Sequence, residues 1–486
     1  MSPGPRRIPF LAQLWRRVPS WRREALRTNL WLVPSALMAA VLALFVATYL
    51  LDRAVYAGRL ALPAWINTGG ADSGRQVLGT IAAAVITVVG VVFSIVILAL
   101  QLASTQFGPR MLRNFVRDLG TQVTLGIFVA TFVFSVVTLG SISSGGRRPD
   151  FVPHFSISVA LALLVLDLIV LIYFIHHVAV TIQLNEVVAG IGRDLVRAVD
   201  EQSEDSRGAD PADPGDSDDP ADWTLLEGAD VPARRSGYLQ AISHESLVRI
   251  AARAGAAIEL LHRPGHFLVE GRPLARVLPA SAAPAVTAAL ERAHVTGRQR
   301  TLTQDPVFAI DQLVEIAIRA LSPAVNDTYT AIACIDWLTA GLCHFSGRVF
   351  FSRVHRDAQG FPRVVQPGLS YARVVNGAFD KVRQAGRGMP AVAIRQLASL
   401  ARIMEYTVTA EQREVLLRQA DMIRRGCEET VPEPEDLLDV RRRHQDVVAA
   451  AARMDSGARP HRPAQPRLGR RGPRPSGALE IHAPKR

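Results

Sequence analysis

Cysteine is scarce in this chain of 486 residues, and the three that occur, Cys334, Cys343 and Cys427, all lie in its polar half. They have no metal-type spacing, and three is a poor number for a disulfide framework. A reducing compartment is the simplest setting for free thiols. The sequence therefore predicts no metal site and places this half of the chain in the cytoplasm.

The common catalytic signatures are also missing. The sequence has no glycine-rich phosphate loop ending in Lys-Ser/Thr, no Gly-x-Ser-x-Gly elbow, no His-Glu-x-x-His and no paired Cys-x-x-Cys. These absences argue against the best-known nucleotide-dependent, hydrolytic and zinc-dependent classes. We expect a protein that is not an enzyme, with no catalytic residue and no cofactor.

Lysine is nearly absent, since only Lys381 and Lys485 occur, and arginine carries almost all of the basic charge behind the net +11. This bias is typical of a GC-rich bacterial genome. A basic protein binds nucleic acid or anionic lipid. Many of the arginines flank apolar segments or lie in the C-terminal tail, so lipid headgroups explain them more simply. We expect a lipid bilayer as a partner, and no nucleic acid.

Long apolar segments are what the sequence has in abundance. Its mean hydropathy is +0.17, and the apolar residues are concentrated in the first 182 positions. A helix needs about 20 apolar residues to cross the hydrocarbon core. A lipid-exposed backbone must be helical to pair its own N–H and C=O groups. The segments that qualify are residues 30–51, 77–102, 122–142 and 155–181.

The predicted fold class is a membrane α-helical bundle of four transmembrane helices followed by an α+β cytoplasmic domain. Residues 1–29 form a basic N-terminal segment, read either as an interfacial amphipathic helix on the inner leaflet or as a disordered leader. It is too long and too basic for a cleavable signal peptide. The other parts are a transmembrane domain (30–182), an acidic Pro/Gly/Asp linker (200–234), the cytoplasmic domain (235–454) and a disordered basic tail (455–486).

Arginine placement predicts the orientation of the bundle. Arginines cluster before the first span and between the second and third, whereas those of the first outer loop are offset by Asp52 and Asp72. Arg147 and Arg148 in the third loop oppose this trend. The balance places both termini in the cytoplasm of a bacterial inner membrane. The clustered residues are Arg6, Arg7, Arg16, Arg17, Arg22, Arg23, Arg27, Arg110, Arg113 and Arg117.

Two of the spans carry polar residues at seven-residue intervals, which keeps them on one stripe of a helix. In one interpretation, small polar residues let helices pack closely and hydrogen-bond to one another. In the other, the stripes line a polar path, for example at the axis of an oligomer. The residues are Thr80, Thr87, Ser94 and Gln101 in the second span, and Thr124, Thr131 and Thr138 in the third.

Asp167 lies near the middle of the fourth span. A carboxylate at this depth costs about 2.5–3.5 kcal/mol on insertion scales, so it is expected to face the interior of the bundle. It is either a proton or cation site, or a neutral packing residue that is hydrogen-bonded to the polar stripes. His176 and His177, near the cytoplasmic end of the same helix, are expected at the membrane interface.

The polar half is expected to begin with a small β-rich module and to continue with helices. Tight turns around Pro264-Gly265 and Gly271-Arg272-Pro273 separate short apolar runs, which is typical of β-structure. The predicted strands are 238–242, 257–261, 267–270 and 274–277, with a hairpin around 357–360. The predicted helices are 246–254, 306–321, 326–337, 371–384, 391–406, 411–425 and 434–454.

The densest polar cluster of the chain follows the β-rich module. Asp311, Glu315 and Arg319 share one helix face at four-residue spacing, and Asp327 is placed to cap the next helix. The cluster is either a capped helix–turn–helix held by ion pairs or a binding site. Its members are Gln304, Asp305, Asp311, Glu315, Arg319, Ser322, Asn326 and Asp327.

Several short motifs carry a resemblance to a known family. They are residues 304–306, 316–327 and 330–331, together with 236–240, 263–267, 92–95, 101–104 and 107–110. These segments resemble a bacterial membrane-protein family catalogued as domain of unknown function 2254. That family tends to have Asp where this chain has His266, and Thr328 stands where Pro is expected. The resemblance implies a four-span topology and no particular activity.

Three functions fit these features. The first is a channel- or transport-like homo-oligomer that moves an ion or small solute and is gated or assembled by its cytoplasmic domain. The second is a non-transporting scaffold or sensor whose cytoplasmic domain binds a partner or a small ligand. The third, a membrane-bound enzyme that uses the cluster from Asp311 to Asp327, has the least support.

Overall fold

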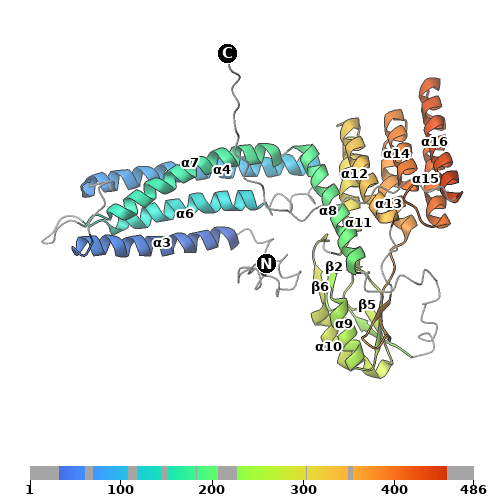
Figure 1. Cartoon of the computed structure of the whole chain (residues 1–486), viewed down its shortest axis with the longest axis horizontal. Helices are drawn as coiled ribbons and strands as arrows, with labels where there is room; N and C mark the ends of the chain where they lie inside the picture. Colours follow the sequence, from blue (N-terminus) through green and yellow to red (C-terminus); the bar gives the residue numbers. More distant parts are fainter. Residues whose placement is uncertain are drawn as a thin grey trace, which may run out of the picture.

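The computed structural model describes residues 32–60, 69–107, 118–143, 151–181, 183–205, 227–302, 304–347 and 354–456. A long helical bundle forms its N-terminal part, next to a second body that holds the strands and the remaining helices (Figure 1). The helices of the bundle are α3 (Leu32–Tyr56), α4 (Ala71–Phe107), α6 (Leu119–Ser141) and α7 (His154–Thr181).

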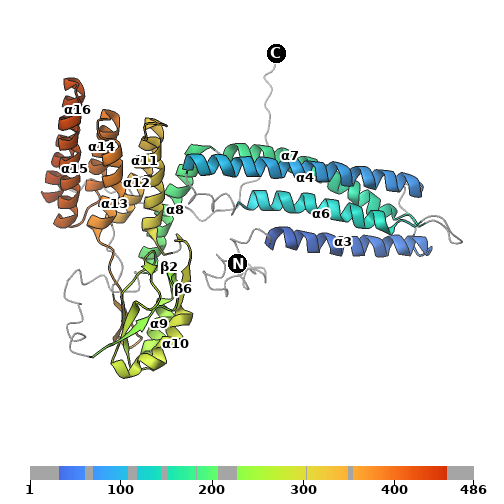
Figure 2. The ribbon, with the colours of Figure 1, turned by 180° about the vertical axis from the view of Figure 1, so that it is seen from behind.

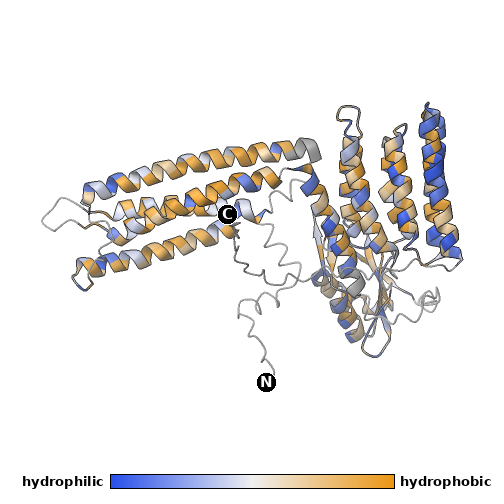
Figure 3. Cartoon of the chain, turned by 45° about the horizontal axis from the view of Figure 1, so that its top comes forward, coloured by the Kyte–Doolittle hydropathy of each residue, from blue (hydrophilic) through white to orange (hydrophobic). Residues whose placement is uncertain are grey.

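Each of these four helices is long and apolar enough to cross a membrane, as the sequence predicts. Their outward-facing side chains are largely apolar: Ile172 of α7 is 71% exposed and Val165 is 58% exposed. Figure 3 shows the same apolar character along most of the bundle. Since hydrocarbon rather than water favours such a surface, the bundle is the membrane part of the protein.

Helix α6 lies at the centre of the bundle and packs against α3, α4 and α7. Gly126 permits a close approach, because a Cβ there would overlap the side chain of Leu37 on α3. Phe128 and Phe134 of α6 are buried in the same interior. The sequence of α6 thus explains its place as the most enclosed of the four helices.

One carboxylate ties the first membrane helix to the last. Asp52, near the end of α3, is buried and accepts hydrogen bonds from the backbone N–H groups of Phe155 (2.7 Å) and Ser156 (3.0 Å). The Ser156 hydroxyl donates to the same carboxylate at 2.7 Å. Because the first N–H groups of a helix have no partner within it, Asp52 caps α7 from a neighbouring helix.

Helix α8 (Leu184–Asp205) joins the bundle to the second body. It begins directly after α7, at a steep angle to it (Figure 1), and packs on α11 and α12. Gly192 lies against Trp337 of α12 so closely that a Cβ would overlap the indole ring. Val188 and Ile191 are buried in the same apolar core as these helices. The end of the membrane bundle is therefore fixed directly to the C-terminal body.

Two small sheets occupy one end of the C-terminal body (Figure 2). The larger has the order β1 (Ala229–Pro232), β5 (Pro273–Leu278), β3 (Ala257–Leu260), β8 (Pro362–Val365) and β7 (Val354–Arg356). Its β3–β8 pair is parallel and its other pairs are antiparallel. The smaller, antiparallel sheet has the order β4 (Phe267–Leu268), β2 (Gly237–Ile242) and β6 (His294–Gly297). Helices α9 (His244–Arg253) and α10 (Ala283–Ala293), with the short η3 (Ala280–Ala282), complete this module.

The rest of the C-terminal body is helical. Helices α11 to α16 share a core with α8, centred on buried apolar residues such as Leu338, Phe379 and Leu400. The helices are α11 (Pro306–Ala320), α12 (Thr328–Ser346), α13 (Tyr371–Ala385), α14 (Pro390–Met404), α15 (Ala410–Thr430) and α16 (Pro434–Asp455).

The predicted fold class is confirmed: four candidate membrane spans precede a domain of helices and small sheets. The strands β1 and β6 and the helices α8 and α10 were not predicted. Helix α8 extends to Asp205 and overlaps the start of the range expected to be a linker, and β1 lies wholly within that range. The N-terminal segment 1–29, positions 206–226 of that linker and the tail beyond 456 lie outside the described residues.

Replacing Asp52 with Ala tests the cap between helices. The variant loses three hydrogen bonds at the start of α7. We expect its free energy of unfolding to be lower than that of wild type by about 1–2 kcal/mol. Thermal unfolding of the detergent-solubilised protein measures this. Asp72→Ala is the matched control, because Asp72 is exposed and forms a surface ion pair with Arg75 at 3.2 Å. Equal melting temperatures for the two variants would contradict the role of Asp52.

Candidate functional site

The two polar stripes predicted from the sequence face opposite ways. On α4, Thr80, Thr87, Ser94 and Gln101 are exposed on the outside of the bundle. The hydroxyls of the first three donate to carbonyls four residues earlier on the same helix, at 2.7, 2.7 and 2.9 Å. Since these bonds satisfy the hydroxyls locally, the stripe is a row of small side chains on the outer surface.

The stripe on α6 faces inward. Thr124, Thr131 and Thr138 are buried, and Thr131 donates its hydroxyl proton to Oδ1 of Asp167 at 3.1 Å. Asp167 is only 3% exposed. Among the described residues, its Oδ2 and the Thr138 hydroxyl have no hydrogen-bond partner. Asp167 and the α6 stripe therefore form a polar interior within one bundle, separate from the outer stripe of α4.

A second polar centre lies at the start of α11. Asp305, which precedes the helix, is 3% exposed, and the Nε and Nη2 atoms of Arg300 approach its Oδ2 at 2.8 and 2.7 Å. The Nη1 atom of Arg300 also donates to Asp311 at 2.5 Å. The Arg300 guanidinium lies over the ring of Phe308, 5.2 Å from its centroid. One arginine thus forms ion pairs with two carboxylates next to the helix start.

The turn between β3 and β4 closes over this ion pair. Gly265 has a φ of +94° and lies where any Cβ would overlap the Asp305 carboxylate, so only glycine fits there. Nε of Arg263 donates to Nε2 of His266 at 3.1 Å. Burial, together with the charge of Arg263, lowers the pKa of His266 to about 4. The imidazole is therefore neutral at physiological pH and can accept this bond.

Gln304 fastens the same centre to the sheet. Its side-chain oxygen accepts from the N–H of Ile242 at 2.8 Å, and its Nε2 donates to the Ile242 carbonyl at 3.0 Å. This pair of bonds joins the amide side chain to the last residue of β2. The motifs at 236–240, 263–267 and 304–306, far apart in the sequence, thus meet in one structural joint between the sheets and α11.

The remaining members of the predicted cluster lie farther along α11 and in the turn after it. Glu315 and Arg319 are half-buried on α11, and the Ser322 hydroxyl donates to the Arg319 carbonyl at 2.7 Å. Asn326 adopts a left-handed φ of 51°, which asparagine tolerates better than most residues. Asp327 caps α12 as expected, accepting from the N–H of Thr330 at 3.0 Å. These contacts favour the capped helix–turn–helix interpretation.

The cluster predicted as one site is therefore two structures. Asp305 and Asp311 belong to the Arg300 joint, and Asp327 belongs to the α11–α12 turn. Sequence reasoning missed Arg300 because no pattern precedes it in its loop. Within the described residues, no three His, Cys, Asp or Glu side chains converge as a metal-binding group. The contacts of both structures join one module of the C-terminal body to the next.

Replacing Arg300 with Gln tests the joint. Asp305 keeps its burial but loses its counter-charge, which we expect to cost about 3 kcal/mol of stability near neutral pH. Burial raises the pKa of the Asp305 carboxyl, and removing Arg300 raises it further. A carboxyl with a higher pKa in the folded than in the unfolded state destabilises the fold when ionised, and this cost fades as pH falls.

In chemical unfolding, the loss of unfolding free energy caused by Arg300→Gln should therefore be smaller at pH 5 than at pH 8. Arg298→Gln, at an exposed position two residues earlier, is the control and should match wild type. A deficit that is independent of pH, or shared by the control, would contradict the assignment.

Comparison with known proteins agrees with this architecture. Residues 27–402 match the family described as "Predicted membrane protein (DUF2254)". Over 368 residues the chain is 31% identical to the uncharacterized proteins Rv1290c of Mycobacterium tuberculosis and Mb1321c of Mycobacterium bovis, covering 74% of this chain and 70% of each relative. No solved structure matches the chain. The resemblance seen in the sequence is thus confirmed, and the chain belongs to the DUF2254 family of predicted membrane proteins.

Proposed function

We infer that the protein is a channel- or transport-like homo-oligomer of the bacterial inner membrane, which moves an ion or small solute. In this proposal α4 of neighbouring copies faces a shared axis. The C-terminal α+β domain lies in the cytoplasm, where it assembles or gates the membrane helices.

The observation that carries the proposal is the outward stripe on α4. Thr80, Thr87 and Ser94 recur every seven residues, and Ala83 and Gly90 are exposed between them. A seven-residue repeat keeps one face turned toward a partner helix, and small residues are the ones that let membrane helices approach closely. A face that touches only lipid needs neither property, so a second copy is the occupant that this stripe fits best.

The connection between the bundle and the C-terminal domain supports a gating role. Helix α8 follows α7 almost without interruption and is embedded in the core of the domain through Val188 and Ile191. A rigid-body movement of that domain would be transmitted directly to α7. Orientation rests on the arginine distribution, which favours cytoplasmic termini.

Disulfide cross-linking tests the shared axis. The native cysteines are buried, so Thr87→Cys adds an accessible thiol on the α4 stripe. Mild oxidation in native membranes should convert at least half of this variant into covalent dimers. Ile172→Cys is the control, because Ile172 is an apolar residue of α7 that is 71% exposed. Equal cross-linking at both positions, or none at position 87, would contradict an α4 interface.

Ion flux from proteoliposomes tests transport itself. If the path follows the shared axis, Ser94→Leu should reduce flux at least tenfold by replacing a small polar side chain with a bulky apolar one. If the path runs through the interior of each bundle, Asp167→Leu should have that effect instead. Ile172→Leu, on the lipid-facing surface, should conduct like wild type. Flux that survives the changes at both Ser94 and Asp167 would contradict both proposed paths, and wild-type protein without flux would contradict a channel.

A non-transporting scaffold or sensor is the alternative function. A cavity in the C-terminal domain, lined by arginines, is the observation that favours it. Cross-linking through α4 without any flux would select this alternative, because it would show an assembled protein that does not conduct.

A further inference from the structure

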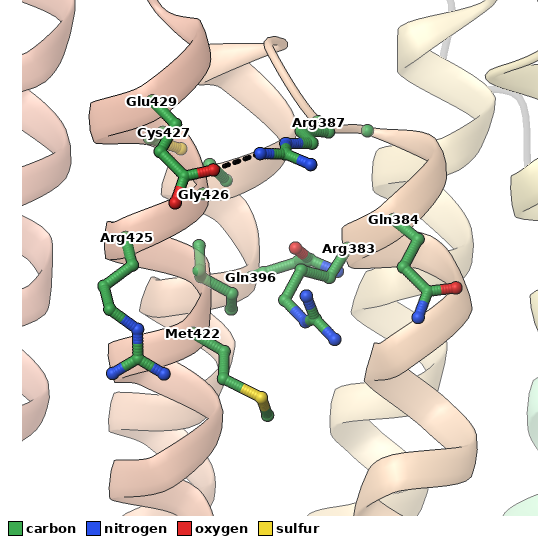
Figure 4. Close-up of a pocket in the computed structure, with 12 residues that line it drawn as sticks. Arg383, Gln384, Arg387, Gln396, Met422, Arg425, Gly426, Cys427 and Glu429 are labelled. Carbon is green, nitrogen blue, oxygen red and sulfur yellow. Dashed lines mark hydrogen bonds and ion pairs between the residues drawn. The ribbon is translucent and has the colours of Figure 1, made fainter.

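Helices α13, α14 and α15 line a cavity of about 320 Å³ that is partly open to solvent. Arg383 of α13 and Gln396 of α14 extend toward one another in its middle, and Met422 of α15 lies below them (Figure 4). Cavities that bind small molecules measure about 300–1,000 Å³, so this one has room for a compact ligand. It lies far from the Arg300 joint and the membrane stripes, and none of the sites described above includes it.

Two buried donors in this cavity lack an acceptor among the described residues. Gln396 is 1% exposed, and its Nε2 has no hydrogen-bond partner. Nε of Arg383 is also buried without a partner. The guanidinium reaches Asp380 only through Nη2, at 3.4 Å, and Gln419 already donates to the same Asp380 oxygen at 2.8 Å. Buried donors are rarely left unpaired in folded proteins, so an acceptor placed between Arg383 and Gln396 would satisfy both.

The rim adds positive charge. Arg387 and Arg425 line the cavity with Arg383, and Glu429 is the acidic residue among the lining side chains. Glu429 forms an ion pair with Arg387 across the upper edge (Figure 4). Since Arg383 is likewise paired with Asp380, the excess of positive charge at the lining comes from Arg425, and this excess favours an anion.

We propose that this cavity binds a small, water-soluble molecule carrying a phosphate group, held between Arg383 and Gln396. A phosphate offers at least three acceptor oxygens, enough for the guanidinium, the amide and a rim arginine together. Helices α14 and α15 lie on the side of the C-terminal body that faces away from the membrane bundle (Figures 1 and 2). A dissolved ligand therefore reaches the site more readily than a lipid headgroup. This binding does not depend on whether the bundle conducts.

Calorimetric titration of the full-length, detergent-solubilised protein with inorganic phosphate tests the proposal, with sodium chloride of equal ionic strength as the baseline. Wild type should bind phosphate saturably, and its melting temperature should rise with it. Arg383→Gln should weaken binding at least tenfold. Arg395→Gln is the matched control on α14: Arg395 is adjacent to Gln396 in the chain but pairs with Asp336 at 3.0 Å outside the cavity. This control should bind like wild type.

A second variant keeps the test decisive if Arg383→Gln unfolds. Gly426 lines the cavity, and a Cβ added there meets nothing within 4 Å. The Cβ of Gly426→Leu therefore meets open space, and we expect its side chain to occupy the cavity, keep the melting temperature of wild type and abolish phosphate binding.

Three results would overturn the proposal. One is a rise in melting temperature that phosphate causes equally in wild type and Gly426→Leu and that sodium chloride also causes, because this would be a general salt effect. Another is tighter binding of citrate than of phosphate, which would identify a carboxylate site. The third is a high-resolution structure in phosphate in which the Gln396 amide is rotated, so that its oxygen accepts from Arg383 and water alone fills the cavity.

Discussion

The hydrocarbon core offers no hydrogen-bond partner, and the membrane half of this protein is arranged around that constraint. The backbone satisfies it by forming helices. Asp52 satisfies it by capping α7, and the hydroxyls of Thr80, Thr87 and Ser94 do so by bonding to their own helix. Asp167 is withdrawn from lipid into the bundle, where Thr131 meets it. The outer face of α4 keeps a row of small residues, and the proposed contact with a second copy of the chain is based on this row.

A series of contacts links the C-terminal body to the membrane bundle. The Arg300–Asp305 pair, enclosed by Gly265 and anchored by Gln304, locks the sheets to the start of α11. Helix α11 packs on α8, and α8 is almost continuous with α7. A ligand between α13, α14 and α15 would act at the opposite side of the same helical core. The proposed binding at Arg383 and the proposed transport at α4 thus involve separate parts of the chain, which α11 and α8 connect.

Much of the architecture could be predicted because it rests on local pattern. Apolar segments of spanning length, Pro-Gly turns and amphipathic repeats place the four spans, most strands and the later helices, and Asp327 reads as a cap from its position alone. The rest depends on contacts between distant residues. Asp52 and Ser156 are 104 residues apart. Arg300 is only five residues from Asp305, but it lies in a loop with no periodic pattern that would predict the pair. Periodicity shows that α4 and α6 each have a polar stripe, but only packing decides that one faces outward and the other inward.

The central claim, that the α4 stripe faces another copy of the chain, is tested most directly by an electron cryo-microscopy structure of the protein in lipid nanodiscs. We expect an oligomer in which Thr80, Thr87 and Ser94 of neighbouring copies approach a common axis. A monomer whose α4 stripe contacts acyl chains along its length would contradict the account.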